Sequence, residues 1–175
     1  MTVSYRDAVP ADAETLAELG RATFIETFGH LYTPENLVAF LETHRPQRWR
    51  AELADPAFAV RLAEEDGRAA AYAKIAPPTL PFETERRAAE LRQFYVLGPW
   101  QGRGISTELM AWAIGEARRR GAEELYLSVF IDNHRARRFY ARYGFEQVGT
   151  YDFMVGTHAD LDLVMRLDLE NARVD

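Results

Sequence analysis

The sequence predicts a mixed α/β fold, in which a sheet of parallel and antiparallel strands carries helices. Two observations predict it. Segments with the two-residue alternation of strands are interspersed with segments whose apolar residues recur at helical spacing, and an Asp-Gly turn joins two of the strands. The 175 residues can bury a sizeable core, and no repeat or linker divides them, so we expect a single domain over residues 1–175.

The first half of the chain begins with a strand and two helices. Residues 3–6 alternate as a short strand. Pro10 and Asp12 begin the first helix, and Pro34 opens the second. The inner faces of these helices are expected to carry Leu16, Leu19 and Thr23 in the first and Leu37, Phe40 and Leu41 in the second.

A hairpin and a second set of strands and helices follow. Asp66-Gly67 lies between the apolar runs 58–63 and 69–75, which is the strongest short hairpin signal. After a proline-rich loop over 76–81, the expected elements are a strand over 90–96, a helix over 105–120, a strand over 125–129, a helix over 133–143 that Gly144 ends, and strands over 145–148 and 161–167.

Composition excludes several classes of site. The chain has no cysteine, which excludes disulfides, thiolate nucleophiles and cysteine zinc sites, and its four histidines lack metal-ligand spacing, so we expect no metal.

The N-terminus has no apolar signal core and no apolar run approaches a membrane span of roughly 18 residues, so we expect a cytoplasmic protein without a membrane partner. The net charge of −6 disfavours nucleic acid, and it suits a cationic substrate and ordinary solubility equally.

A glycine-containing turn joins the strand over 90–96 to the long helix. It reads Gln-Gly-Arg-Gly-Ile-Ser over residues 101–106. Gly102 and Gly104 permit backbone angles closed to other residues and let N–H groups converge on one spot. At a helix N-terminus such donors form an anion site, to which Arg103 adds a cation. The natural ligand is a pyrophosphate, and a plain strand-to-helix turn is the structural alternative.

The turn does not match two common phosphate motifs. No Gly-Lys-Ser/Thr follows it, as a P-loop requires. It also lies late in the chain and lacks the third glycine of the dinucleotide-binding fingerprint.

Together with a later motif, the turn resembles the GNAT superfamily of acyl-CoA-dependent N-acetyltransferases. The family turn is Gln/Arg-x-x-Gly-x-Gly/Ala, and the chain supplies Gln101, Gly104 and, in the last place, Ser106. Residues 133–145 match the family pattern Asn-x-x-Ala-x-x-Phe-Tyr-x-x-x-Gly-Phe without a gap. The resemblance implies about seven strands with helices on both faces, splayed central strands, acetyl-CoA as co-substrate and, by family habit, a homodimer.

A narrower resemblance concerns the two ends of the chain. They are similar to the PaiA-type polyamine acetyltransferases at Thr23-Phe24, Thr27-Phe28, Tyr32, Pro34–Leu37, Phe153, Gly156, Asp162 and Met165. This subgroup implies a small-molecule amine as acceptor, with a polyamine such as spermidine as one candidate.

The GNAT resemblance also implies which residues bind the cofactor. The pantetheine arm would lie along the fourth strand, and the turn would wrap the pyrophosphate. The implied contacts are Phe94, Tyr95, Val96, Gln101, Gly102, Arg103, Gly104, Ile105, Ser106, Thr107, Asn133, Tyr140 and Arg142. Structural alternatives stay open: Asn133 is also a helix cap, and Arg142 and Arg138 would either meet the 3′-phosphate or lie on a solvated face.

Tyr140 is the residue for which the resemblance implies proton transfer. The family places this tyrosine beside the sulfur of coenzyme A. A phenol with a pKa of about 10 can protonate a departing thiolate. The alternative is a core aromatic residue that packs beside Ala136 and Phe139.

The acceptor arrives as an ammonium ion and needs a base, which is usually a carboxylate. Glu90 begins the fourth strand and by alternation shares a face with Phe94 and Val96, so we predict it as the catalytic base. Arg92 occupies the next position on that face, where many family members carry an acid.

Other polar residues are weaker candidates for the acceptor pocket. Glu26 is an alternative base or an exposed helix residue, and His158 and Asp160 are expected in a C-terminal loop. The predicted function is direct transfer of an acetyl group from acetyl-CoA to a primary amine. The alternatives are a GNAT-fold protein that binds acyl-CoA without catalysis, a GNAT acting on peptide N-termini, amino acids or aminoglycosides, and a nucleotide-phosphate enzyme.

Overall fold

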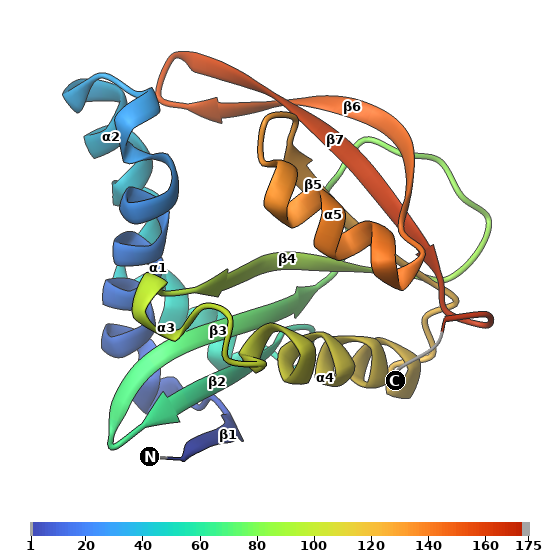
Figure 1. Cartoon of the computed structure of the whole chain (residues 1–175), viewed down its shortest axis with the longest axis horizontal. Helices are drawn as coiled ribbons and strands as arrows, with labels where there is room; N and C mark the ends of the chain where they lie inside the picture. The colour runs from blue at the N-terminus through green and yellow to red at the C-terminus, as the bar shows by residue number, and fades with distance from the viewer. Residues whose placement is uncertain (1, 173–175) are drawn as a thin grey trace.

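The computed structural model describes residues 2–172, which form one seven-stranded sheet (Figure 1). The strands lie in the order β1-β2-β3-β4-β5-β7-β6; β4 and β5 run parallel, and the other neighbouring pairs are antiparallel. Their bounds are β1 Val3–Asp7, β2 Ala59–Glu65, β3 Arg68–Ala76, β4 Ala88–Val96, β5 Glu124–Phe130, β6 Glu146–Val155 and β7 His158–Asp168. The predicted mixed sheet is confirmed.

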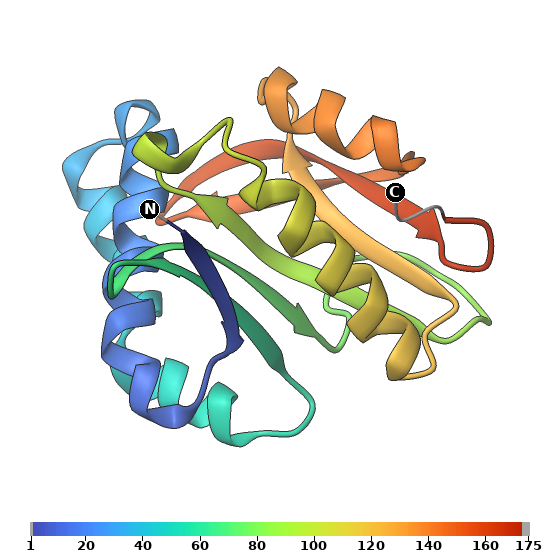
Figure 2. The same ribbon diagram turned by 60° about the horizontal axis from the view of Figure 1, so that its bottom comes forward.

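Helices cover both faces of the sheet, as predicted. Their bounds are α1 Ala13–Phe28, α2 Pro34–Leu41, α3 Pro46–Ala54, α4 Ile105–Arg119 and α5 His134–Tyr143. Leu16 of α1 and Trp49 of α3 join Leu62 and Tyr72 in a buried cluster on one face. On the other face α4 lies across the central strands (Figure 2), with Leu109 fully buried. No helix within residues 2–172 is long and apolar enough to cross a membrane.

Helix α3 is not predicted from the sequence. Pro46 occupies its first turn, and Trp49 anchors it with a ring centroid 5.5 Å from that of Tyr72. The other residues of α3 are mostly polar, so no helical apolar period is visible in the sequence. Helix α2 begins at Pro34 as predicted, with Thr33 as its cap, but its apolar stripe is only half-buried.

The hairpin between β2 and β3 is confirmed. Asp66 and Gly67 both have positive φ, 51° and 74°. Two such residues in succession match the twist of the flanking strands, which explains why the Asp-Gly pair is so informative.

Strand β4 contains the irregularity that opens the sheet. Its register with β3 skips Arg92 between Leu91 and Gln93, so Arg92 is the extra residue of a β-bulge. Strand β4 pairs with β5 only through Ala88, Ala89 and Glu90, and the two strands then diverge (Figure 2, green and light orange). The splayed central strands are therefore confirmed.

Strands β6 and β7 form a long hairpin at one edge of the sheet. The strand predicted over 145–148 extends to Val155, and the one predicted over 161–167 already begins at His158. Gly156, with φ of 58°, lies in the tight turn between them. The loop predicted for His158 and Asp160 is wrong, because the hairpin turn is shorter than the run of polar residues suggests.

Candidate active site

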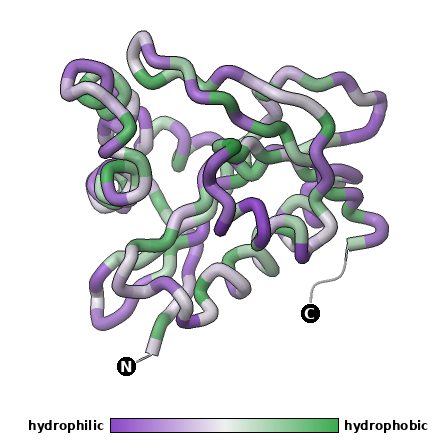
Figure 3. The backbone as a smooth tube through the Cα atoms, turned by 45° about the horizontal axis from the view of Figure 1, so that its top comes forward, coloured by the Kyte–Doolittle hydropathy of each residue, from purple (hydrophilic) through white to green (hydrophobic). Residues whose placement is uncertain are grey.

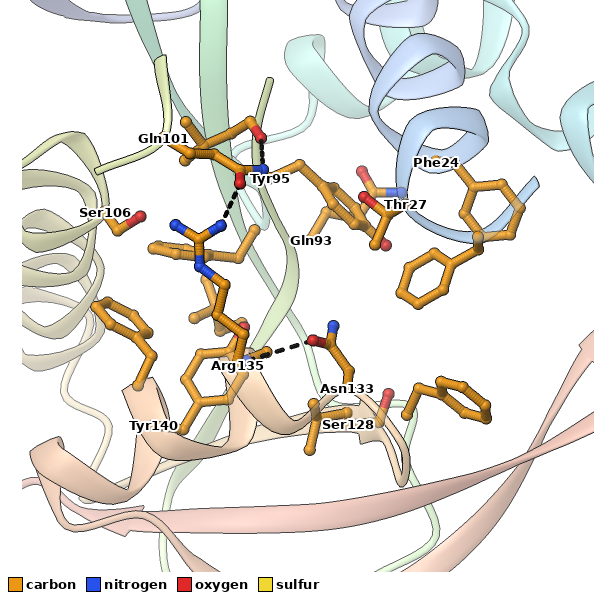
Figure 4. Close-up of a pocket in the computed structure, with 18 of the residues that line it drawn as sticks. Phe24, Thr27, Gln93, Tyr95, Gln101, Ser106, Ser128, Asn133, Arg135 and Tyr140 are labelled. Carbon is orange, nitrogen blue, oxygen red and sulfur yellow. Dashed lines mark hydrogen bonds between the residues drawn. The ribbon is translucent and has the colours of Figure 1, made fainter. Parts of the chain in front are cut away.

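A cavity of about 710 Å³ lies where β4 and β5 separate (Figure 4). Its walls come from α1, β4, the turn into α4, β5, α5 and β7. The predicted cofactor residues that line it are Phe94, Tyr95, Val96, Gln101, Gly102, Gly104, Ser106, Thr107, Asn133, Tyr140 and Arg142. The fold thus gathers two motifs that are separate in the sequence.

The glycine turn has the geometry of an anion site. Gly102 and Gly104 have φ of 76° and 83°, and Gly104 is the N-cap residue of α4 without a side-chain cap. The first N–H groups of α4 therefore have no partner within the helix. A Cβ built on either glycine would meet no atom within 4 Å, so the backbone is open to approach. These donors and the helix dipole fit a phosphate group of acetyl-CoA.

Two residues of the turn direct their side chains away from the cavity. The guanidinium of Arg103 donates to Glu65 Oε2 at 3.0 Å, and the Trp100 indole donates to the same oxygen at 2.8 Å. Ile105 is buried in the core. The prediction that Arg103 adds a cation to the anion site is wrong, because the nearly buried carboxylate of Glu65 holds that cation. Arg103 and Ile105 can therefore contact the cofactor only through their backbone N–H groups.

A pair of hydrogen bonds connects the turn with β4 and α5. Gln101 Nε2 donates to the carbonyl of Val96 at 3.0 Å, and Arg135 donates to Gln101 Oε1 (Figure 4). Arg135 is not among the residues predicted from the sequence, because it is one of several arginines in a strongly polar helix (Figure 3, mostly purple). It lies four residues before Phe139 and seven before Arg142, and that spacing places all three on one face.

Helix α5 holds other predicted residues in place. Asn133 caps it by accepting a hydrogen bond from the Ala136 N–H at 3.3 Å, so the predicted cap is confirmed. Arg142 lines the cavity, and its guanidinium carbon lies 5.6 Å from the ring centroid of Phe139. Arg138 is exposed and does not line the cavity.

Tyr140 is both a core aromatic residue and a cavity residue. Its side chain packs against the rings of Phe94, Phe139 and Phe145 and is 7% exposed. Burial raises the pKa of the Tyr140 phenol well above its ordinary value, and the neighbouring Tyr95 adds to the increase. The phenol therefore keeps its proton at neutral pH.

Glu90 does not share a face with Phe94 and Val96, so that part of the prediction is wrong. The bulge at Arg92 reverses the alternation of β4, and Glu90 lines a second cavity instead. Its carboxylate is buried, accepts the Thr79 N–H at 3.1 Å and pairs with Arg92 Nε at 2.7 Å. A count of alternating residues cannot reveal an extra residue of this kind.

Helix α1 forms the wall opposite α5. Phe24 and Thr27 lie on this side (Figure 4), beside Phe28. Glu26 also lines the cavity, and its carboxylate accepts the N–H of Gly98 at 2.9 Å. This bond ties α1 to the start of the turn.

Two carboxylates from β7 line the same cavity. Asp160 and Asp162 are 7% and 6% exposed. Asp160 accepts a hydrogen bond from Tyr32, and its other oxygen lies 3.0 Å from His158 Nε2. Acids two residues apart in a mostly apolar strand are the sequence signal that would have placed both on one face. Within residues 2–172, no three histidine, aspartate or glutamate side chains are arranged to hold a metal ion.

A second cavity, of about 320 Å³, adjoins the first, and the residues that line both are Leu91, Arg92, Gln93, Tyr95, Ser128 and Phe153. Its charged lining residues are Arg48, Lys74, Arg92, Glu52 and Glu90. Lys74 is buried and donates to Glu52 Oε2 at 2.6 Å. Burial lowers the pKa of His44 to about 4, so this residue is neutral at pH 7. Three cations against two carboxylates give this cavity a positive formal charge.

Comparisons with known proteins agree with this geometry. Residues 22–145 match the model of the acetyltransferase (GNAT) family. An uncharacterized N-acetyltransferase of Mycobacterium tuberculosis is 33% identical over 159 residues, covering 90% of this chain and 98% of that protein. An aminoalkylphosphonate N-acetyltransferase of Salmonella typhimurium is 35% identical over 99 residues, which is 55% of this chain and 62% of that protein.

Solved structures share the fold. The PaiA N-acetyltransferase of Thermoplasma acidophilum, in complex with coenzyme A, superposes with a TM-score of 0.76 at 20% identity. The superposition covers 96% of this chain and 99% of that chain.

Proposed function

The chain belongs to the GNAT family of acetyltransferases, and we propose that it transfers the acetyl group of acetyl-CoA directly to a primary amine within a single catalytic domain. The observation that carries the proposal is that the glycine turn and Tyr140 line one cavity. The turn supplies main-chain donors for the pyrophosphate, and Tyr140 supplies a proton for the leaving thiolate. Direct transfer needs no protein nucleophile, which suits a chain without cysteine.

Different groups of the cavity have different roles in binding and in the reaction. Beyond Glu90, β4 no longer pairs with β5, and the edge that faces β5 offers backbone groups to the pantetheine arm. An N–H at this edge would also stabilise the negative oxygen of the tetrahedral intermediate. Tyr140 donates its proton as the carbon–sulfur bond breaks. Arg135 and Arg142 carry positive charge that complements the phosphates of coenzyme A.

The contacts of the Glu90 carboxylate support a structural role for this residue better than the predicted role as catalytic base. Its carboxylate accepts the N–H groups of Thr79 and Leu80 and pairs with Arg92. Protonation of Glu90 would leave the largely buried guanidinium of Arg92 without its carboxylate partner, which is costly. We infer that Glu90 holds the proline-rich loop against β4.

For the acceptor we propose a cationic primary amine, with a polyamine such as spermidine as the first candidate. Asp160 and Asp162 supply negative charge at one end of the cavity. The aromatic side chains of Phe24, Phe28 and Tyr32 line the cavity too, and aromatic faces attract ammonium groups. The resemblance of the chain ends to PaiA-type enzymes supports the same class.

A second candidate acceptor is an amine that also carries an anionic group. The positive second cavity favours it, because the distal ammonium of a polyamine would meet Arg48, Lys74 and Arg92 there. The relative from Salmonella typhimurium is named for an acceptor of this kind, an aminoalkylphosphonate.

Three acceptors of similar length separate these candidates: 1,4-diaminobutane, 4-aminobutanoate and butylamine. The measurement is kcat/KM from release of free coenzyme A thiol. A preference for the diamine supports the polyamine class, and a preference for 4-aminobutanoate supports the second candidate. Arg48→Gln removes a cation whose side chain is 58% exposed, so it should shift the preference toward the diamine by about two- to fivefold. Refusal of these and all other primary amines by a protein that binds acetyl-CoA would contradict the proposed function and favour the binding-only alternative.

The homodimer and the cytoplasmic location expected from the sequence stay predictions. Light scattering coupled to size exclusion would test the homodimer, and fractionation of the source cells would test the location.

A further inference from the structure

Asp162 is a buried carboxylate without a cationic partner. It lies on β7, opposite Phe130 of β5 and Tyr151 of β6, and its side chain lines the main cavity. Asp162 is 6% exposed. Among residues 2–172, no lysine, arginine or histidine forms an ion pair with it, whereas Asp160 pairs with His158. A carboxylate buried without a cationic partner is costly to ionise, so it binds a proton more readily than an exposed carboxylate.

The groups that surround Asp162 are nearly all uncharged at neutral pH. The hydroxyl of Ser128 of β5 lies near enough to lower the pKa of Asp162, and the phenols of Tyr32, Tyr95 and Tyr151 lie near enough for its charge to raise their pKa values. The charged neighbour on the same strand is the carboxylate of Asp160, two residues earlier in β7. The pKa of Asp162 is raised to about 7, mainly by burial; the charge of Asp160 adds to the increase, and Ser128 opposes it.

The other carboxylates of the two cavities are already engaged. Asp160 is held by Tyr32 and His158, Glu90 by Arg92 and Thr79, Glu52 by Lys74, and Glu26 by the N–H of Gly98. Asp162 alone, among the acids lining these cavities in residues 2–172, has neither an ion pair nor a main-chain N–H donor, and the Ser128 hydroxyl is a polar neighbour that lowers its pKa. It is therefore the carboxylate that is free to accept a proton.

We propose that Asp162 is the catalytic base that removes a proton from the ammonium group of the acceptor. The inference rests on the proposed acetyl transfer and deepens it. One N–H bond of the ammonium breaks, its electron pair stays on nitrogen, and the proton passes to the Asp162 carboxylate. The neutral amine then attacks the acetyl carbonyl carbon.

A carbon–nitrogen bond forms, the carbon–sulfur bond breaks, and the sulfur takes the proton of Tyr140. The nitrogen loses its second proton, which restores Tyr140, and the proton on Asp162 leaves to solvent. The products are the N-acetyl amine, coenzyme A thiol and one proton.

The test is the pH profile of kcat/KM with butylamine and acetyl-CoA. In the wild type, kcat/KM should rise with pH and level off above an apparent pKa of about 7. Asp162→Asn should lose about 10²–10⁴-fold near pH 7. The deficit should shrink as the pH approaches the pKa of the amine, because free amine no longer needs a base. The matched control is Asp152→Asn, the same change at an exposed β6 residue outside both cavities.

A second variant tests the base without removing it. Ser128→Ala removes the hydroxyl that lowers the pKa of Asp162, so the rising limb of the profile should move to higher pH. Thermal shifts with acetyl-CoA confirm that each variant is folded. The assignment would be overturned if Asp162→Asn kept the wild-type kcat/KM and the wild-type rise of kcat/KM with pH. It would also be overturned if Ser128→Ala did not move that rise to higher pH. A wild type that acetylates no amine would instead overturn the proposed function itself.

Discussion

Arg135 on α5 and Gln101 in the glycine turn are joined by a hydrogen bond across the main cavity. Gln101 in turn donates to the carbonyl of Val96, so the last residue of β4, the turn and α5 form one connected unit. The contact brings a guanidinium beside the turn whose N–H groups are open to an anion. Arg135 is therefore a candidate phosphate ligand.

Arg135→Gln should weaken acetyl-CoA binding by roughly 10–100-fold, which is typical for loss of a hydrogen bond from a charged group. Isothermal titration with acetyl-CoA measures the effect. Arg138→Gln is the matched control, because Arg138 lies on the same helix and does not line the cavity. Equal affinities of the two variants would remove Arg135 from the phosphate site.

Gly104→Val should abolish the thermal shift caused by acetyl-CoA while the protein stays folded. The β-branched side chain is strained at φ of 83°, at a cost of roughly 1–2 kcal/mol, and it fills the space from which a phosphate approaches. Gly115→Ala, inside α4 and with no atom within 4 Å of the added Cβ, should keep the shift. A larger shift with ATP than with acetyl-CoA in the wild type would favour the nucleotide alternative.

Tyr140→Phe should lower kcat and kcat/KM together by about 10²–10⁴-fold, because the proton is needed only in the transition state. Acetyl-CoA affinity should change little, since the ring and its contacts with Phe94 and Phe145 remain. The loss should shrink with an acyl donor that has a better leaving thiol. Wild-type turnover by the variant would point to a water molecule as the acid.

The raised pKa of Asp162 also has a consequence for stability. Its folded-state value of about 7 lies above the ordinary 3.8, so the folded protein binds this proton more tightly than the unfolded chain. The stabilisation of the folded state by this proton is complete below about pH 4 and declines as the pH rises to about 7. The free energy of unfolding of the wild type, compared with that of Asp162→Asn, should therefore decrease between pH 4 and pH 7. Above pH 7 the difference between the two proteins should stay constant. Urea unfolding of both proteins across this range gives the comparison, and parallel curves would contradict the raised pKa.

Local signals in the sequence were sufficient for much of the fold. The Asp66-Gly67 turn, the Asn133 cap and the apolar period of α4 each depend on neighbours within a few positions, so pattern and propensity predict them. The resemblance carried by the motifs around Gln101 and Tyr140 implied that both contact one cofactor, and both motifs line one cavity.

The errors concern contacts between distant residues. Arg103 is held by Glu65, a residue of another element that no local pattern links to the turn. The bulge at Arg92 exists only in the register of β4 against β3, and it changes the face of Glu90. Asp162 could have been found from its spacing to Asp160, but its lack of a cationic partner is visible only in the folded chain.

The central claim is direct transfer of the acetyl group from acetyl-CoA to a primary amine. The most direct test is a rapid-quench experiment with excess enzyme, acetyl-CoA and the best acceptor of the three-amine panel, with mass spectrometry of both the small molecules and the intact protein. If the transfer is direct, coenzyme A thiol and N-acetyl amine appear at the same rate and in equal amounts, while the protein mass never increases by an acetyl group. Thiol release without N-acetyl amine, or an acetylated protein that forms before the product, would contradict it.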